Sequence, residues 1–322
     1  GLTVVSSGLL LLSNATAFAS AISNDAVVEF HSSAPNDASP DWGYTKTLSG
    51  TGTVNKTGTG WLHIQVGQVA MSGQINVQGG IFSGNTGGST WTGNTASLDV
   101  SAGAVFSPHG NQIFLGALTG AGLVDNRGTN TSTITIGSAD RSGIFMGNIT
   151  NNANALSLVK IGAGTQTLGG TNVHTGTTTI NGGTLALGAG ALLATTPRIV
   201  LATGATFDVT AVGTFPLANL QSLEGFGTVA GAVNAAGGSR LVPGTATTAG
   251  TLTFGSQLNL AAATTNQFSL HASDTTIGGG INDLIEVASF EYNTPVIRFV
   301  QKGMGVSSVN GEKITEEQVQ VA

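Results

Sequence analysis

The chain has 322 residues, of which 49 are glycine and only 8% carry a charge, and its formal net charge is −6. With 40% hydrophobic residues it does not have the low hydrophobicity and high charge of a disordered chain, so we expect it to fold. It offers no basic cluster for nucleic-acid phosphates, and no cysteine for a disulfide, a thiolate metal site or a nucleophile.

The first apolar segment runs from Leu9 to Ala21. It superficially resembles the end of a signal peptide, but no basic residues precede it, so we interpret it as one β-helix coil. Spanning a bilayer takes about 18 consecutive apolar residues, and no segment of the chain reaches that length. We therefore expect no transmembrane segment.

Residues 31–44 carry two prolines and predict a loop that projects from the body of the protein. The carboxylates of Asp37 and Asp41 could bind a cation, and the rings of Trp42 and Tyr44 could stack on a sugar. These four residues are the predicted ligand-binding residues. The alternative is a solvated loop whose aromatic side chains cover a coil.

Other chemistry-bearing residues are scattered along the chain. The five histidines show no metal-ligand spacing, and the remaining acidic residues form no pair suited to acid–base catalysis. We expect no catalytic residue, no metal and no cofactor. Trp61 and Trp91 are predicted to pack in the interior.

Short segments with alternating polar and apolar residues recur through the chain, and glycine pairs separate them. Such a strand can bury only one face, so we expect successive coils to stack into a parallel β-helix with one axial core. Coils of roughly 25 residues would give on the order of 12 coils. The clearest of these segments are residues 73–82, 96–100, 132–136, 177–187 and 250–254.

Two glycine motifs repeat. Leu-x-Gly-x-Gly-x-Val begins at Leu48, Leu118 and Leu223, and Lys-x-Gly-x-Gly begins at Lys56 and Lys160. The last two Leu motifs are 105 residues apart and the Lys motifs are 104 apart. These offsets predict two similar blocks of several coils each, with glycine at corners that need a positive φ or close backbone approach.

The stretch from Leu158 to Leu187 closely resembles the passenger-associated transport repeat of autotransporters and related surface proteins. In that family a Lys and a Gly-x-Gly precede a Thr-Leu strand, an Asn-x-Tyr-Thr-Gly turn and Thr-x-Ile-x-x-Gly-Thr-Leu. Here His174 stands at the usual aromatic position. Looser similarity extends from about Gly1 to Val287, since residues 241–245 and 282–287 look like the end of such passengers.

The resemblance implies a right-handed parallel β-helix, export beyond the outer membrane, and a role in adhesion, aggregation or surface structure. It also implies a C-terminal translocating barrel, which we do not find in this sequence. The chain is therefore expected to be a cleaved passenger or fragment, or one of the relatives that lack a barrel.

The composition changes near residue 290. The last 33 residues hold seven charged side chains, and segments 295–300 and 318–321 predict strands around an Asn-Gly turn. We therefore predict an all-β chain with a parallel β-helix at residues 1–289. Residues 290–322 are predicted to form a cap or a strand segment that pairs with another subunit.

The leading hypothesis is a secreted, cell-surface protein without enzymatic activity that mediates attachment or aggregation. Its expected partners are a host or neighbouring-cell surface, matrix or glycans. One alternative is the subunit of an extracellular filament that self-associates through residues 290–322. The other is a glycan-binding or glycan-cleaving β-helix protein.

Overall fold

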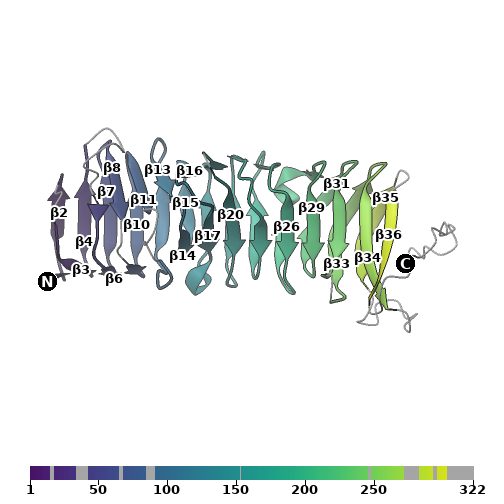
Figure 1. The fold of residues 1–322 in the computed structure, drawn as a ribbon, viewed down its shortest axis with the longest axis horizontal. Helices are drawn as coiled ribbons and strands as arrows, with labels where there is room; N and C mark the ends of the chain where they lie inside the picture. Colours follow the sequence, from purple (N-terminus) through teal and green to yellow (C-terminus); the bar gives the residue numbers. More distant parts are fainter. Residues whose placement is uncertain are drawn as a thin grey trace.

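The computed structural model describes residues 1–14, 18–33, 43–64, 68–84, 91–152, 154–245, 248–271, 283–292 and 296–302. These residues form an elongated rod in which the chain advances along the long axis from one end to the other (Figure 1). The rod is an all-β parallel solenoid of about 11 turns, as predicted. Its right-handed sense stays a prediction.

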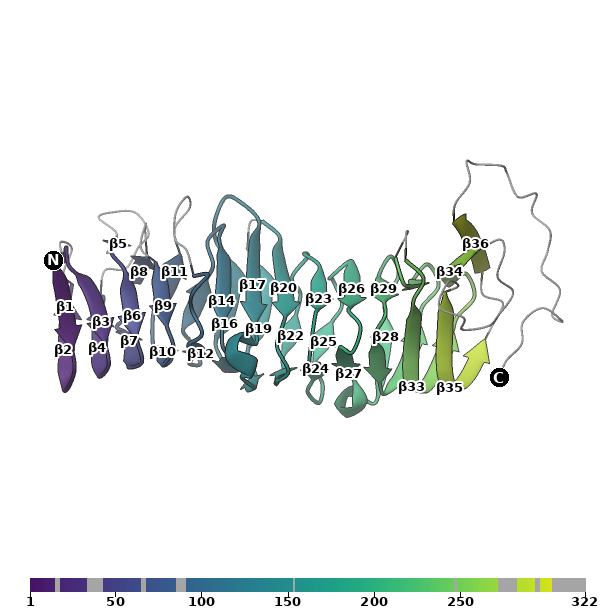
Figure 2. The same ribbon diagram turned by 90° about the horizontal axis from the view of Figure 1, so that it is seen from below.

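Three long faces run along the rod (Figure 2). One face is a 15-stranded sheet, the long sheet. A second face begins as a four-stranded sheet and continues, later in the chain, as a nine-stranded sheet. The third face is a six-stranded sheet followed by a two-stranded one and then by β28 (Thr214–Leu217) and β31 (Ala232–Ala235). The long strand β33 (Thr251–Leu260) pairs with strands of both faces and so joins these two strands to the long sheet. All pairings between the described strands are parallel.

The strands of the long sheet are β2 (Leu9–Ser13), β4 (Val27–His31), β7 (Thr53–Thr57), β10 (Gln74–Val77), β12 (Ser97–Val100), β15 (Leu118–Gly120), β18 (Gly143–Phe145), β21 (Thr165–Leu168), β24 (Thr184–Leu187), β27 (Thr206–Asp208), β28 (Thr214–Leu217), β30 (Thr228–Ala230), β31 (Ala232–Ala235), β33 (Thr251–Leu260) and β35 (Leu284–Tyr292). The four-stranded sheet holds β1 (Leu2–Val5), β3 (Ala21–Asn24), β6 (Leu48–Gly50) and β9 (Val69–Met71).

The nine-stranded sheet holds β14 (Gln112–Leu115), β17 (Ser132–Ile136), β20 (Leu156–Lys160), β23 (Thr178–Ile180), β26 (Arg198–Leu201), β29 (Ser222–Gly225), β32 (Arg240–Pro243), β34 (Thr265–His271) and β36 (Val296–Lys302). The six-stranded sheet holds β5 (Gly43–Tyr44), β8 (Trp61–Ile64), β11 (Ile81–Gly84), β13 (Val105–Ser107), β16 (Leu123–Asn126) and β19 (Asn148–Asn151). The last sheet pairs β22 (Thr171–Asn172) with β25 (Leu192–Leu193).

Helical structure among the described residues is limited to two single 3₁₀ turns, η1 (Ser138–Asp140) and η2 (Thr210–Val212). No helix in this part of the chain has the length and apolar character needed to cross a membrane. Each of the short segments expected from the sequence forms one or two strands of the solenoid.

The core is a set of axial rows in which one residue of each rung lies against the next. Val28, Val54, Ile75 and Leu98 follow one another in register on β4, β7, β10 and β12, and all four are buried. Their neighbours on the same strands point outward. One rung takes from 18 residues, as between Ser222 and Arg240, to 33, as between Thr251 and Leu284.

The Leu-x-Gly-x-Gly-x-Val motif is a corner between two faces. Gly50, Gly120 and Gly225 all have positive φ, between 97° and 115°. A Cβ at each would lie 2.1 Å from a carbonyl oxygen of the preceding rung. Only glycine therefore permits rungs to stack at one strand spacing at these corners.

The Lys-x-Gly-x-Gly motif buries its lysine at a corner. Lys56 Nζ donates to the carbonyl oxygens of Thr57, Gly58 and Gly79, at 2.8, 3.1 and 3.1 Å. The last acceptor belongs to the next rung, so the ammonium ties two rungs together. Burial lowers the pKa of Lys56 to about 8.

Lys160 repeats this arrangement with the carbonyl oxygens of Ile161, Gly162 and Gly182. Burial lowers the pKa of Lys160, and Asp140 opposes this shift. However, Lys56 lies on the long sheet and Lys160 on the nine-stranded sheet. The offset of 104 residues therefore does not mark two superposable blocks, because the same corner chemistry recurs at different corners of the solenoid.

The solenoid continues through the composition change near residue 290. Strand β35 pairs in parallel with β33, and β36 pairs in parallel with β34, so the strand expected at 295–300 adds another rung. The expected boundary at 289/290 falls inside β35. Residues 303–322, with the second strand of the expected hairpin, lie outside the described residues, and a cap there stays a prediction.

The stacking argument predicts unequal effects for two glycine substitutions. Gly103 and Gly120 both have positive φ, but a Cβ at Gly103 meets no atom within 4 Å. Gly103→Ala should lower the free energy of unfolding by about 1 kcal/mol, through the left-handed backbone alone. Gly120→Ala should lower it by about 3 kcal/mol or more, because its Cβ meets Val100 O. Chemical denaturation followed by circular dichroism measures both, and equal losses would contradict close stacking.

Candidate functional site on the six-stranded sheet

A row of polar side chains crosses the outer side of the six-stranded sheet. His63 pairs with Ser83, and Ser83 pairs with Ser107. Asp125 follows next, since the residues before it and before Ser107 are paired. The inward positions beside this row are apolar and buried, namely Leu62, Phe82, Phe106 and Val124. Strand alternation thus places one polar side chain per rung on the outside of this sheet.

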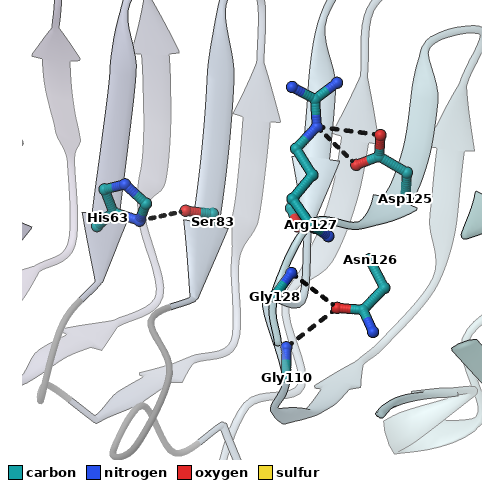
Figure 3. Close-up of polar contacts among 8 residues, drawn as sticks. His63, Ser83, Gly110, Asp125, Asn126, Arg127 and Gly128 are labelled. Atoms are coloured by element: carbon teal, nitrogen blue, oxygen red, sulfur yellow. Dashed lines mark hydrogen bonds and ion pairs between the residues drawn. The ribbon is translucent and has the colours of Figure 1, made fainter. Parts of the chain in front are cut away.

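His63 and Ser83 form a short hydrogen bond, with 2.6 Å between Nδ1 and Oγ (Figure 3). A serine beside a histidine is the usual start of a serine nucleophile. Here Ser83 is fully buried and His63 nearly so, which keeps substrate away from Oγ. The pair therefore joins two rungs, and the geometry gives it no catalytic role.

Aromatic rings cover one end of the polar row. The rings of Trp61 and His63 have centroids 5.1 Å apart, and His109 packs edge-on against His63 at 5.5 Å. His109 has a positive φ of 52°, which is uncommon for a non-glycine residue. This contact could not be predicted, because the two histidines are 46 positions apart in the sequence and only the rung register brings them together.

The other end of the row holds an ion pair. Arg127 Nε donates to both carboxylate oxygens of Asp125, at 2.9 and 3.0 Å. The guanidinium carbon lies 5.7 Å from the ring centroid of Trp61, within the range of a cation–π contact. Asp125 is buried, so the guanidinium supplies the opposite charge that such a carboxylate requires.

Asn126 fixes the two turns that flank this ion pair. Its Oδ1 accepts hydrogen bonds from the backbone N–H groups of Gly110 and Gly128 (Figure 3). Its Nδ2 donates to the carbonyl oxygens of Asn130 and Asn154. One buried amide thus connects turns from three successive rungs, and it positions the backbone on both sides of Arg127.

Three of the four predicted ligand-binding residues come just before β5 in the sequence, and the fourth, Tyr44, is part of β5, a strand of the six-stranded sheet. Asp37, Asp41 and Trp42 are outside the described residues, so their binding role stays a prediction. Gly43, which follows them, pairs with His63 on the six-stranded sheet.

Tyr44 is part of the core. Its side chain is buried against Phe30, and its hydroxyl lies 2.9 and 3.0 Å from the carbonyl oxygens of Ser20 and Thr47. Burial raises the pKa of Tyr44. In this position its ring covers a coil, which was the alternative interpretation, and does not face a ligand in solvent.

The other predictions for chemistry-bearing residues concern packing and metals. Trp61 and Trp91 are both buried, as predicted, and Trp91 packs between Phe82 and Phe106. Among the residues that the structure describes, no three His, Asp or Glu side chains gather as metal ligands.

Comparison with known proteins finds one repeat family and one similar adhesin. The family model of the passenger-associated transport repeat matches residues 158–187. The chain carries this repeat. It is also 33% identical over 152 residues to the adhesin BmaC autotransporter of Brucella suis biovar 1 (strain 1330). That alignment covers 46% of this chain and 4% of the adhesin. No solved structure matches the chain.

The matched repeat is one turn of the solenoid plus its overlap with the next turn. It begins on β20 and ends on β24, so that β20 pairs with β23 and β21 pairs with β24 inside the repeat. Lys160 and its acceptor Gly182 both lie within it. The repeat pattern is therefore readable in the sequence because it contains both sides of one rung-to-rung contact.

His174 is the residue of this repeat that departs from the family pattern, and it is fully buried. Thr196 Oγ1 donates to Gly176 O, and Thr178 Oγ1 donates to Thr196 Oγ1. His174 Nε2 therefore carries the proton that it shares with Thr178 Oγ1, at 2.9 Å. No described residue donates to His174 Nδ1. Desolvation lowers the pKa of His174 to about 4.

The lowered pKa of the buried His174 predicts that the solenoid loses stability in acid. In the unfolded chain the pKa of His174 is about 6.5, so below pH 6.5 the unfolded state binds a proton that the folded state rejects. The free energy of unfolding should fall by about 3 kcal/mol between pH 7 and pH 4 through this residue. His174→Gln removes the titration and keeps an amide nitrogen near Thr178.

Denaturation of both proteins at pH 8 measures the packing cost of the substitution, and denaturation at pH 4 adds the effect of the proton. His174→Gln should lose less stability than the parent protein between these two pH values. Equal losses would show that His174 does not bind the proton on unfolding.

Proposed function

We propose that this protein acts at the cell surface as a secreted, non-enzymatic β-solenoid that attaches to other surfaces or aggregates cells. The observation that carries the proposal is the transport repeat at residues 158–187, set inside an uninterrupted solenoid. The similarity to a protein named as an adhesin supports it. Because the chain covers 4% of that adhesin, the activity of the whole adhesin enters only as part of this proposal.

The physical form of the rod suits attachment. Only 8% of the residues are charged, and threonine takes outward positions on many strands, such as Thr53, Thr165 and Thr184. Such a surface meets little electrostatic repulsion when it approaches another surface. A solenoid also folds rung by rung through contacts between neighbours, which suits a chain exported in an unfolded state.

Bead adhesion tests this proposal. Beads coated with the purified chain should be retained on cultured host cells, on bacterial lawns, on matrix proteins or on glycan arrays. Retention on at least one of these surfaces should exceed that of control beads by several-fold. The control beads carry the same mass of chain, denatured and blocked. Retention equal to the control on all four surfaces would overturn the proposal.

Self-association is the second candidate. Strands β35 and β36 each end the strand order of their sheet and pair, among the described strands, with one neighbour only. An unpaired strand edge can accept a strand from another chain. We propose that residues 290–322 use such pairing when molecules associate end to end.

Light scattering tests this second candidate. The full chain should show a mass above that of a monomer, and the mass should rise with concentration. A variant that ends at Ser289 lacks the whole of residues 290–322, and it should be monomeric. A monomeric full chain at all concentrations, or a truncated chain that still polymerises, would exclude assembly through this segment.

A further inference from the structure

Arg127 keeps hydrogen-bonding capacity that the fold does not use. Its Nε is occupied by Asp125, and no described residue accepts a hydrogen bond from Nη1 or Nη2. Figure 3 shows both terminal nitrogens directed away from the carboxylate. The Arg127 side chain is 26% exposed. Arginine presents these donors as a planar fork that fits a carboxylate.

The fork is held in place before any ligand arrives. Asp125 fixes the guanidinium through Nε, and the Trp61 ring lies against it. The backbone N–H of Arg127 donates to Ser107 Oγ at 3.1 Å. A donor positioned in this way loses less side-chain entropy on binding than a free surface arginine.

Apart from Asp125, the part of the six-stranded sheet around Arg127 is polar and uncharged. On strands β8 to β19 of this sheet and in the turns that follow them, Asp125 and Arg127 are the only Asp, Glu, Lys or Arg residues. The turn after Arg127 continues with exposed Thr129, Asn130 and Thr131. An acidic peptide calls for several neighbouring cations. A single cation among hydroxyl and amide groups matches a sugar that carries one carboxylate.

We propose that Arg127, seated on Trp61, binds the carboxylate of an acidic sugar in a surface glycan. The Nη1 and Nη2 groups donate to the two carboxylate oxygens. This inference rests on the proposed adhesive function and names a ligand class for it.

Calorimetric titration of the full chain with a short oligomer of galacturonic acid tests the inference. The acidic oligomer should bind, and a galactose oligomer of equal length should not. Arg127→Gln should weaken binding about tenfold, since it removes a charged pair of donors. Arg127→Lys keeps the charge without the fork and should weaken binding as well. Circular dichroism establishes that each variant is folded.

Arg198 provides the matched control. It is also an arginine in an ion pair, but its Nε and Nη2 are both bonded to Glu224, and it lies on the nine-stranded sheet. Arg198→Gln should leave binding of the acidic oligomer unchanged. If both variants lose binding of the acidic oligomer equally, the binding depends on the overall charge of the chain and not on Arg127, and the assigned site is overturned.

Two further measurements distinguish the glycan site from an acidic-peptide site and from the proposed adhesive function. Poly-glutamate should bind much more weakly than the acidic glycan, and equal binding that is lost in Arg127→Gln would replace the glycan with an acidic peptide. Adhesion of beads coated with Arg127→Gln separates this site from the proposed function. If the beads still adhere while the acidic oligomer does not bind the parent chain, the inference fails and the adhesive function stands.

Discussion

Direct contact between the backbones of successive rungs is the constraint on which this structure depends. At Gly50, Gly120 and Gly225 the missing Cβ leaves room for a carbonyl oxygen of the rung before. Where three faces meet at narrow corners, any side chain would force the rungs apart and break the axial rows of the core. The abundance of glycine follows from this contact. The scarcity of charge follows from the same stacking, because each outward residue lies one strand spacing from its equivalent in the next rung.

Tight corners create a second requirement, since their carbonyl groups turn inward and need donors. Lys56 and Lys160 meet it with one ammonium for three carbonyls, and Asn126 meets it with one amide that also accepts two N–H bonds. These side chains occupy core positions and keep buried backbone groups paired. His174 shows the limit of this solution. Its ring fills an inward position but can be held there only in the neutral form.

The strands, the corner glycines and the parallel stacking could be predicted because each depends on a pattern within one rung. The contact of His63 with His109 and the seat of Arg127 on Trp61 could not, because they depend on how many residues each rung contains. Rungs vary by several residues, so spacing along the chain does not reveal which outward side chains meet. For the same reason, the spacing of 104 residues between the two lysine motifs does not place them at the same corner of the solenoid. Tyr44 differs again, because it lies at the end of the predicted loop and the local pattern does not reveal that its ring belongs to the core.

Rung length varies at every corner of the rod, since six residues separate β17 from β18 and five separate β27 from β28. Two residues separate β6 from β7, and three separate β7 from β8. By contrast, five separate β16 from β17, and the turns that hold His109 and Arg127 all follow strands of the six-stranded sheet. Tight corners are fixed by glycine and cannot change without loss of stacking. Longer turns occur at all three corners, so recognition at Arg127 depends on the side chains of its own turn and not on a corner reserved for variation.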